Sequence, residues 1–224
     1  YVAKWNGSAW SALGSGLNGL VYALAVSGSD LYVGGFFTIA GGSEANRIAK
    51  WNGSAWSALG SGLSGKVHAL AVAGSDLYVG GFFTTAGGSV ANRIAKWDGS
   101  AWSALGSGLN SSVWALAVSG SDLYVGGDFT TAGGSAANYV AKWNGSAWSA
   151  MGSGLNNQVS ALAVSGSDLY VGGAFTTAGG SAALRIAKWN GSAWSALGSG
   201  LNSLVYALAV SGSDLYVGGD FTTA

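Results

Sequence analysis

Few side chains in this sequence have the chemistry of a catalytic centre. His68 is the only histidine, cysteine is absent, and nine acidic residues balance nine basic ones. A single histidine cannot be assembled with confidence into a Ser-His-Asp set, and no group of ligands has metal-site spacing. We therefore predict no enzyme activity, no catalytic residue, no metal and no cofactor.

Five aspartates recur at one position of a repeated DLYVGG stretch. An aspartate at such a place usually closes a turn by accepting hydrogen bonds from backbone N–H groups, and we interpret these in that way. The five are Asp30, Asp76, Asp122, Asp168 and Asp214.

The positions at which the repeats differ carry side chains suited to ligand binding. Aromatic faces beside a few oriented polar groups suit a sugar or another small polar ligand. We predict six ligand contacts: Tyr22, His68, Trp114, Tyr206, Asp128 and Asp220. The partner would be a carbohydrate or a protein ligand. The alternative is that these positions are exposed and vary freely.

The most frequent motif is WNGSAW, which occurs four times and once more as WDGSAW at 97–102. The asparagine forms an N-x-S sequon, but Asp98 keeps the turn chemistry and loses the glycosylation acceptor. We interpret the motif as a two-residue type I′ turn in which both Asn and Gly adopt positive φ. This register pairs Trp5 with Ser8 and Ala3 with Trp10, which places the two indoles on one face, packed between neighbouring sheets.

Composition narrows the class of partner. The 224 residues are 49% hydrophobic and only 8% charged, with 40 glycines, so we expect a compact core. The balanced charge offers no basic field for nucleic acid. We therefore predict no nucleic-acid partner. No apolar run approaches 18 residues and no export signal opens the sequence, so we also predict no membrane partner.

The elements that position these residues repeat every 46 residues. The repeats are 1–46, 47–92, 93–138, 139–184 and a shortened 185–224. Within a repeat, 21–26 and 30–35 predict one β-hairpin, and 47–51 and 54–60 predict a second, joined by a GGS-containing linker. Frequent glycine and the absence of a helical apolar stripe argue against helix.

Four strands per 46-residue repeat predict an all-β fold, a five-bladed β-propeller with four antiparallel strands per blade. DLYVGG followed by RIAKWNGSAWSAL resembles the kelch-type blade. The whole chain is similar to glycine-rich, kelch-like repeats of bacterial surface or secreted proteins. That resemblance implies binding or scaffolding without a common ligand, and an extracellular or cell-surface location if the protein is natural. The repeat also resembles the tachylectin-type five-bladed lectin, although no binding motif is shared.

The two ends of the chain predict how the ring closes. Residues 1–14 supply only the third and fourth strands of a blade, and 204–223 supply only the first and second. We predict one domain over 1–224, closed by pairing the N-terminal and C-terminal half-blades, because closure leaves no free sheet edge. A monomer is favoured, and the alternative is a two-chain strand-swapped ring.

Antiparallel topology gathers the variable positions at one rim of the predicted disc, since they lie at the start of the first strand, the end of the second and the start of the third.

The near identity of the repeats leaves a second interpretation open. The chain would then be an engineered or recently amplified symmetric propeller without a biological ligand.

Overall fold

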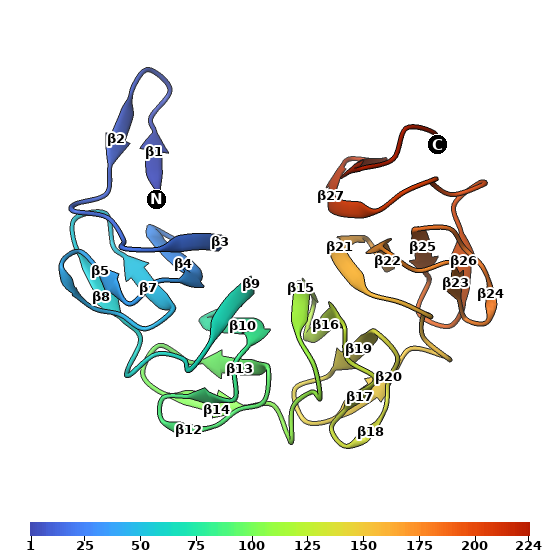
Figure 1. The fold of residues 1–224 in the computed structure, drawn as a ribbon, viewed down its shortest axis with the longest axis horizontal. Helices are drawn as coiled ribbons and strands as arrows, with labels where there is room; N and C mark the ends of the chain where they lie inside the picture. The colour runs from blue at the N-terminus through green and yellow to red at the C-terminus, as the bar shows by residue number, and fades with distance from the viewer. The chain divides into compact units, whose positions relative to one another are not determined.

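The computed structural model describes all 224 residues and contains strands but no helix (Figure 1). The chain divides into two compact units, Tyr1–Ala104 and Leu105–Ala224, and each is described by itself. The repeating element of both is a four-stranded antiparallel sheet, here called a blade. The predicted all-β fold with four strands per repeat is therefore confirmed.

The first unit holds an N-terminal half-blade and two complete blades. The half-blade is β1 (Ala3–Trp5) and β2 (Trp10–Ala12). Blade 1 is β3 (Leu20–Ser27), β4 (Asp30–Phe36), β7 (Ile48–Trp51) and β8 (Trp56–Ala58). Blade 2 is β9 (Lys66–Ala73), β10 (Asp76–Phe82), β13 (Ile94–Trp97) and β14 (Trp102–Ala104). The first strands β3 and β9 contact each other, so the two sheets pack face to face.

The second unit holds two complete blades and a C-terminal half-blade. Blade 3 is β15 (Val113–Ser119), β16 (Asp122–Gly127), β19 (Val140–Trp143) and β20 (Trp148–Ala150). Blade 4 is β21 (Val159–Ser165), β22 (Asp168–Gly173), β25 (Ile186–Trp189) and β26 (Trp194–Ala196). The half-blade is β27 (Val205–Ser211) and β28 (Asp214–Gly219). Here β21 contacts both β15 and β27.

The GGS-containing segment, predicted as a linker, contains a small hairpin of its own. In blade 1 it is formed by two-residue strands in which Ile39 pairs with Glu44 and Ala40 with Ser43. These small sheets are β5 (Ile39–Ala40) with β6 (Ser43–Glu44), β11 (Thr85–Ala86) with β12 (Ser89–Val90), β17 (Thr131–Ala132) with β18 (Ser135–Ala136), and β23 (Thr177–Ala178) with β24 (Ser181–Ala182).

The first hairpin of each blade agrees with the prediction. Ser27 pairs with Asp30 across a two-residue turn, and Gly28 supplies the positive φ of 58° that such a turn requires.

The predicted register of the WNGSAW hairpin is wrong. Trp51 pairs directly with Trp56, and Asn52 is not among the residues with positive φ. The loop instead has four residues, and the Asn52 side chain organises it. Its Oδ1 accepts hydrogen bonds from Ser54 N, Ser54 Oγ and Ala55 N at 2.8–3.0 Å. Side-chain bonding of this kind competes with the tighter two-residue turn and here replaces it.

The indole pair of each blade still lies on one face, as predicted. In blade 2 the rings of Trp97 and Trp102 are 5.2 Å apart, and Trp102 Nε1 donates to Leu59 O at 2.8 Å. Leu59 belongs to the loop after blade 1, so this bond joins two successive blades. The outer tryptophans of the complete blades are half-buried.

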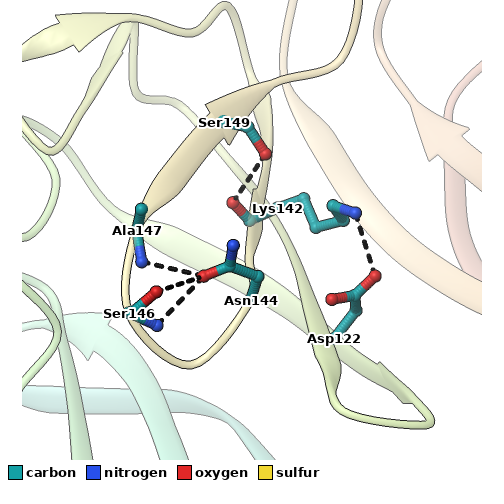
Figure 2. A network of polar contacts seen from close by, with 6 residues as sticks. All are labelled: Asp122, Lys142, Asn144, Ser146, Ala147 and Ser149. Carbon is teal, nitrogen blue, oxygen red and sulfur yellow. Dashed lines mark hydrogen bonds and ion pairs between the residues drawn. The ribbon is translucent and has the colours of Figure 1, made fainter.

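The interpretation of the repeated aspartates as turn-closing residues is also wrong. In each complete blade the carboxylate forms an ion pair with a lysine of the third strand. Figure 2 shows the example of blade 3, where Lys142 Nζ lies 2.9 Å from Asp122 Oδ2. Tyr124 pairs with Lys142 in the sheet, which brings the lysine beside the end of the first hairpin. The bond to Asp122 raises the pKa of Lys142 above its usual value.

A pair of glycines lies at or next to the end of the second strand because no side chain fits there. A Cβ on Gly34 would collide with Val67 of the next blade, and one on Gly35 would collide with Leu20 O. The close approach of β4 to β9 depends on this absence, and fully buried side chains such as Val33, Val67 and Ile48 pack around it.

Each half-blade forms a two-stranded sheet with no third strand bonded to it. The five blades, the closure of the ring and the single domain over 1–224 therefore stay predictions.

Candidate functional site at the variable rim

One of the two most variable positions of the repeat is the extra residue of a β-bulge. In blade 1, Val21 pairs with Gly35 and Ala23 with Gly34, so that Tyr22 has no partner on β4. Blade 2 repeats the irregularity at His68, and the C-terminal half-blade repeats it at Tyr206. A bulge bends the strand and changes the direction of the side chain of the extra residue. This local geometry explains why the position accepts residues as different as Tyr, His, Trp and Ser.

The three variable places of a repeat lie at one end of its sheet. Lys66, before the bulge, pairs with Phe82 at the end of β10. Arg93, before β13, accepts a backbone hydrogen bond from Gly81 through its carbonyl oxygen at 2.9 Å. Arg93 adopts a left-handed φ of 66°, and the equivalent residues of the other complete blades do likewise. The variable rim of each unit is hereafter this end of its sheets.

The rim of the second unit contains a pocket of about 330 Å³. Its walls come from the first strands of successive blades and from the segments beside them. The lining residues are Trp114, Gln158, Ser160, Ala174, Leu204 and Tyr206. Two of the predicted contact residues, Trp114 and Tyr206, thus line one pocket.

Each of these aromatic residues is bonded to a predicted aspartate. Trp114 Nε1 donates to Asp128 Oδ2 at 2.7 Å, and the Tyr206 hydroxyl donates to Asp220 Oδ2 at 2.6 Å. The bond to Asp220 raises the pKa of Tyr206 above its usual value. Each carboxylate retains a second oxygen, Oδ1, that can accept from a ligand.

The other two predicted residues lie in the first unit. The rings of Tyr22 and His68 lie with their centroids 5.3 Å apart and their planes tilted by 38°. Where blade 3 and the C-terminal half-blade carry Asp128 and Asp220, the first unit carries Phe36 and Phe82 instead. The two rims therefore share a backbone and differ in chemistry.

The prediction missed Gln158 and Ser160 as pocket residues. The signal was present, because both stand at positions where the five repeats differ. Their small or polar side chains gave no reason, taken alone, to prefer them to the aromatic residues.

The described residues include no group of three or more His, Cys, Asp or Glu side chains arranged to hold a metal ion. The structure also has no helix of the length and apolarity needed to cross a membrane.

Repeated four-stranded antiparallel sheets, packed through their first strands, define the class of β-propeller proteins. The chain matches the family of the Rax2 C-terminal beta propeller domain over residues 6–152 and again over residues 100–214. The chain belongs to this family. No curated protein matches it.

The solved structures that share the fold include two computationally designed proteins. The computationally designed Ika8 protein is 18% identical with a TM-score of 0.52, covering 88% of this chain and 67% of its own. The computationally designed Ika4 protein is also 18% identical, with a TM-score of 0.51, covering 80% of this chain and 97% of its own. These likenesses concern the fold alone. None of the comparisons tests the kelch-like or the tachylectin-type resemblance.

Proposed function

We propose that the chain is a non-enzymatic β-propeller that serves as a binding module, with a sugar or similar small polar ligand at the rim of the second unit. The observation that carries the proposal is the pocket of about 330 Å³ between Trp114 and Tyr206. An indole and a phenol ring offer apolar faces to the C–H surface of a sugar ring. Asp128 and Asp220 lie beside them as acceptors for ligand hydroxyls.

The aromatic and carboxylate groups are already oriented. Because each ring donates to its aspartate, neither side chain has to be ordered when a ligand arrives, which lowers the entropic cost of binding. Gln158 adds an amide that can both donate and accept, and Ser160 adds a hydroxyl.

A glycan array followed by calorimetry tests this proposal. The informative variant is Trp114→Ser with Asp128→Ala, because blade 4 carries Ser160 and Ala174 at the equivalent places. We expect sugar binding by the parent chain, at least a tenfold loss in the variant and an almost unchanged melting midpoint. A blank array, or equal affinity in the variant, would exclude the site.

The second candidate function is a scaffold without a biological ligand. Two observations favour it: long stretches are identical between repeats, and the similar structures are computationally designed. The two candidates are distinguished by the same array, because a scaffold gives no signal with any sugar.

We further propose that the two half-blades pair as a fifth blade, and that they do so within one chain. The contacts of this fifth blade follow from the equivalent residues of the complete blades. Lys4 would pair with Asp214, as Lys142 does with Asp122, and Trp10 Nε1 would donate to Leu197 O, as Trp102 does to Leu59 O.

Both half-blades have surfaces suited to this pairing. Trp10 is 70% exposed, and Tyr216 on β28 is 59% exposed, whereas Tyr32 at the same position of blade 1 is 8% exposed. A pocket of about 320 Å³ lies beside β28, lined by Leu197, Gly198, Leu215 and Val217 among others. The glycine equivalent to Gly198 lies beside the paired tryptophans of the complete blade that follows it, since a Cβ on Gly106 would come within 3.6 Å of Trp148 and 3.7 Å of Trp143.

A further inference from the structure

We infer that the rim of the first unit is a separate binding site for a small aromatic carboxylate. The site is an open pocket of about 280 Å³ at the junction of blades 1 and 2. Its lining includes Phe36, Phe82, Ser64, Thr84, Lys66 and Arg93. Since all of these residues belong to the first unit, the inference is independent of the pocket at Trp114 and Tyr206.

Positive charge is concentrated at this pocket. The four ion pairs of the molecule use Lys50, Lys96, Lys142 and Lys188, and none of them involves Lys66, Arg93 or the adjacent Arg47. The acids nearest in sequence to Lys66 and Arg93 are used elsewhere, since Asp76 pairs with Lys96 and Asp98 accepts hydrogen bonds within its own loop. Glu44, the acid nearest to Arg47, accepts a hydrogen bond from Asn46 Nδ2 at 2.8 Å. The pocket thus presents two cations without a carboxylate partner, which favours an anionic ligand.

The cations are held against two phenyl rings. The Arg93 guanidinium lies 4.5 Å from the Phe82 ring centroid, and Lys66 Nζ lies 5.3 Å from that of Phe36. Arg93 Nη1 also donates to Phe83 O at 3.0 Å, which fixes the direction of the guanidinium. Its remaining N–H groups are the natural donors to a carboxylate.

The two rings select an aromatic anion over an inorganic one. Phe36 is 45% exposed and Phe82 is 53% exposed, so both retain a large apolar surface in water. A bare phosphate would leave that surface uncovered. A planar ring bearing a carboxylate covers it and at the same time meets Lys66 and Arg93.

Ser64, at the base of the pocket, differs from the residue at this position in the other four repeats. Asn18, Asn110, Asn156 and Asn202 stand where blade 2 has Ser64. In the second blade of the other unit, for example, Asn156 Oδ1 accepts from Thr176 N and Nδ2 donates to Thr176 Oγ1 at 2.8 Å. Ser64 Oγ accepts from Thr84 N and Thr85 N at 3.0 Å but has no amide to reach the threonine hydroxyl. The shorter side chain leaves space and two hydroxyl groups at the base of the pocket.

Titration with benzoate, followed by calorimetry and by NMR of the aromatic protons, tests the inference. We expect saturable binding of benzoate that weakens as salt is added. Benzamide has the same ring without the charge, and acetate has the charge without the ring. Both should bind at least tenfold more weakly. Absence of saturable benzoate binding, or equal affinity for benzamide, would overturn the inference.

Two variants locate the site. Lys66→Gln removes a cation from an exposed side chain and should weaken benzoate at least tenfold. Ser64→Asn restores the residue of the other repeats, and should abolish binding while the melting midpoint stays unchanged or rises. The matched control is Asn110→Ser, which makes the reverse change in the second unit and should leave benzoate affinity unaltered. Unchanged affinity in Lys66→Gln or Ser64→Asn would contradict the assignment.

The sugar proposal and this inference can fail separately. The Trp114→Ser, Asp128→Ala variant should keep full benzoate affinity, and Ser64→Asn should keep any sugar binding. Loss of benzoate binding in the Trp114 variant would place the aromatic anion at the other rim and would contradict the inference.

Discussion

The same WNGSAW hairpin exists in two environments, and the comparison separates local from tertiary causes. In the N-terminal half-blade the rings of Trp5 and Trp10 lie 5.5 Å apart, and in blade 2 those of Trp97 and Trp102 lie 5.2 Å apart. The hairpin therefore has one geometry whether or not it has neighbours. Its surroundings differ, because Trp102 is half-buried and bonded to Leu59 O, whereas Trp10 is 70% exposed. The motif determines its own shape, and the adjoining strands determine its burial.

The largest expected effect comes from removing the N-terminal half-blade. Deletion of residues 1–14 would leave β28 without the partner strands that we propose for it, exposing the apolar surface at Leu215 and Val217. We expect the truncated chain to aggregate or to lose its cooperative melt, and a synthetic peptide of residues 1–14 to restore it. A monomer with an unchanged cooperative melt would show that the half-blades do not pair. Native mass spectrometry of the parent chain distinguishes a one-chain ring of 22.1 kDa from a ring of twice that mass.

The second prediction compares the two tryptophans directly. Trp102→Ser removes half-buried indole packing and the bond to Leu59 O, and should destabilise the protein by about 2 kcal/mol. If the fifth blade forms, Trp10→Ser should cost about the same, since its indole would occupy the equivalent place. Urea unfolding of both variants measures the difference. A negligible cost for Trp10→Ser alone would argue that the N-terminal hairpin remains solvated.

The third prediction concerns the loop that all five hairpins share. Asn52→Ala removes the Oδ1 acceptor of three hydrogen bonds and should cost about 1 kcal/mol in unfolding free energy. Asn52→Asp should cost much less, because Asp98 accepts the same three bonds in blade 2. Equal losses in the two variants would show that the amide group itself is needed.

The smallest expected effect is a pH dependence confined to one blade. Hydrogen bonds from Ala101 N and from Ser100 lower the pKa of Asp98 to about 2. A carboxylate with a lowered folded-state pKa contributes stability that is present above its unfolded pKa of about 3.9 and is lost as pH falls toward 2. Asp98→Asn should remove this part of the acid sensitivity while leaving stability near neutral pH almost unchanged. Identical acid unfolding curves for parent and variant would contradict the assignment.

The variable rims of the two units also differ, and this difference concerns ligand binding. The rim of the second unit joins Trp114 to Asp128 and Tyr206 to Asp220, whereas that of the first joins Arg93 to Phe82. The backbone around these side chains is the same, because the first strand of each repeat has a bulge opposite the two glycines of the second strand. Ligand chemistry can therefore change from blade to blade without a change of fold.

Local signals were sufficient to predict most of the strands. Alternating apolar residues, a two-residue turn at Gly28 and a fixed 46-residue period specify the first hairpin of each blade, because these features act within a few residues. The variable positions were also readable as one edge, since antiparallel topology fixes which strand ends meet. Ser64, where the other four repeats have asparagine, distinguishes blade 2 in the sequence itself.

Other features depended on contacts that the sequence pattern does not contain. The loop register follows from three hydrogen bonds to Asn52 Oδ1, which no pairing pattern of apolar residues can indicate. Asp122 meets Lys142 only because strand pairing brings together residues 20 positions apart. The sequence by itself determined the repeating unit and its local geometry, since both follow from short-range propensity. Tertiary structure decided which charges pair, which indoles are covered and where pockets open, because these depend on distances between side chains of different strands and blades.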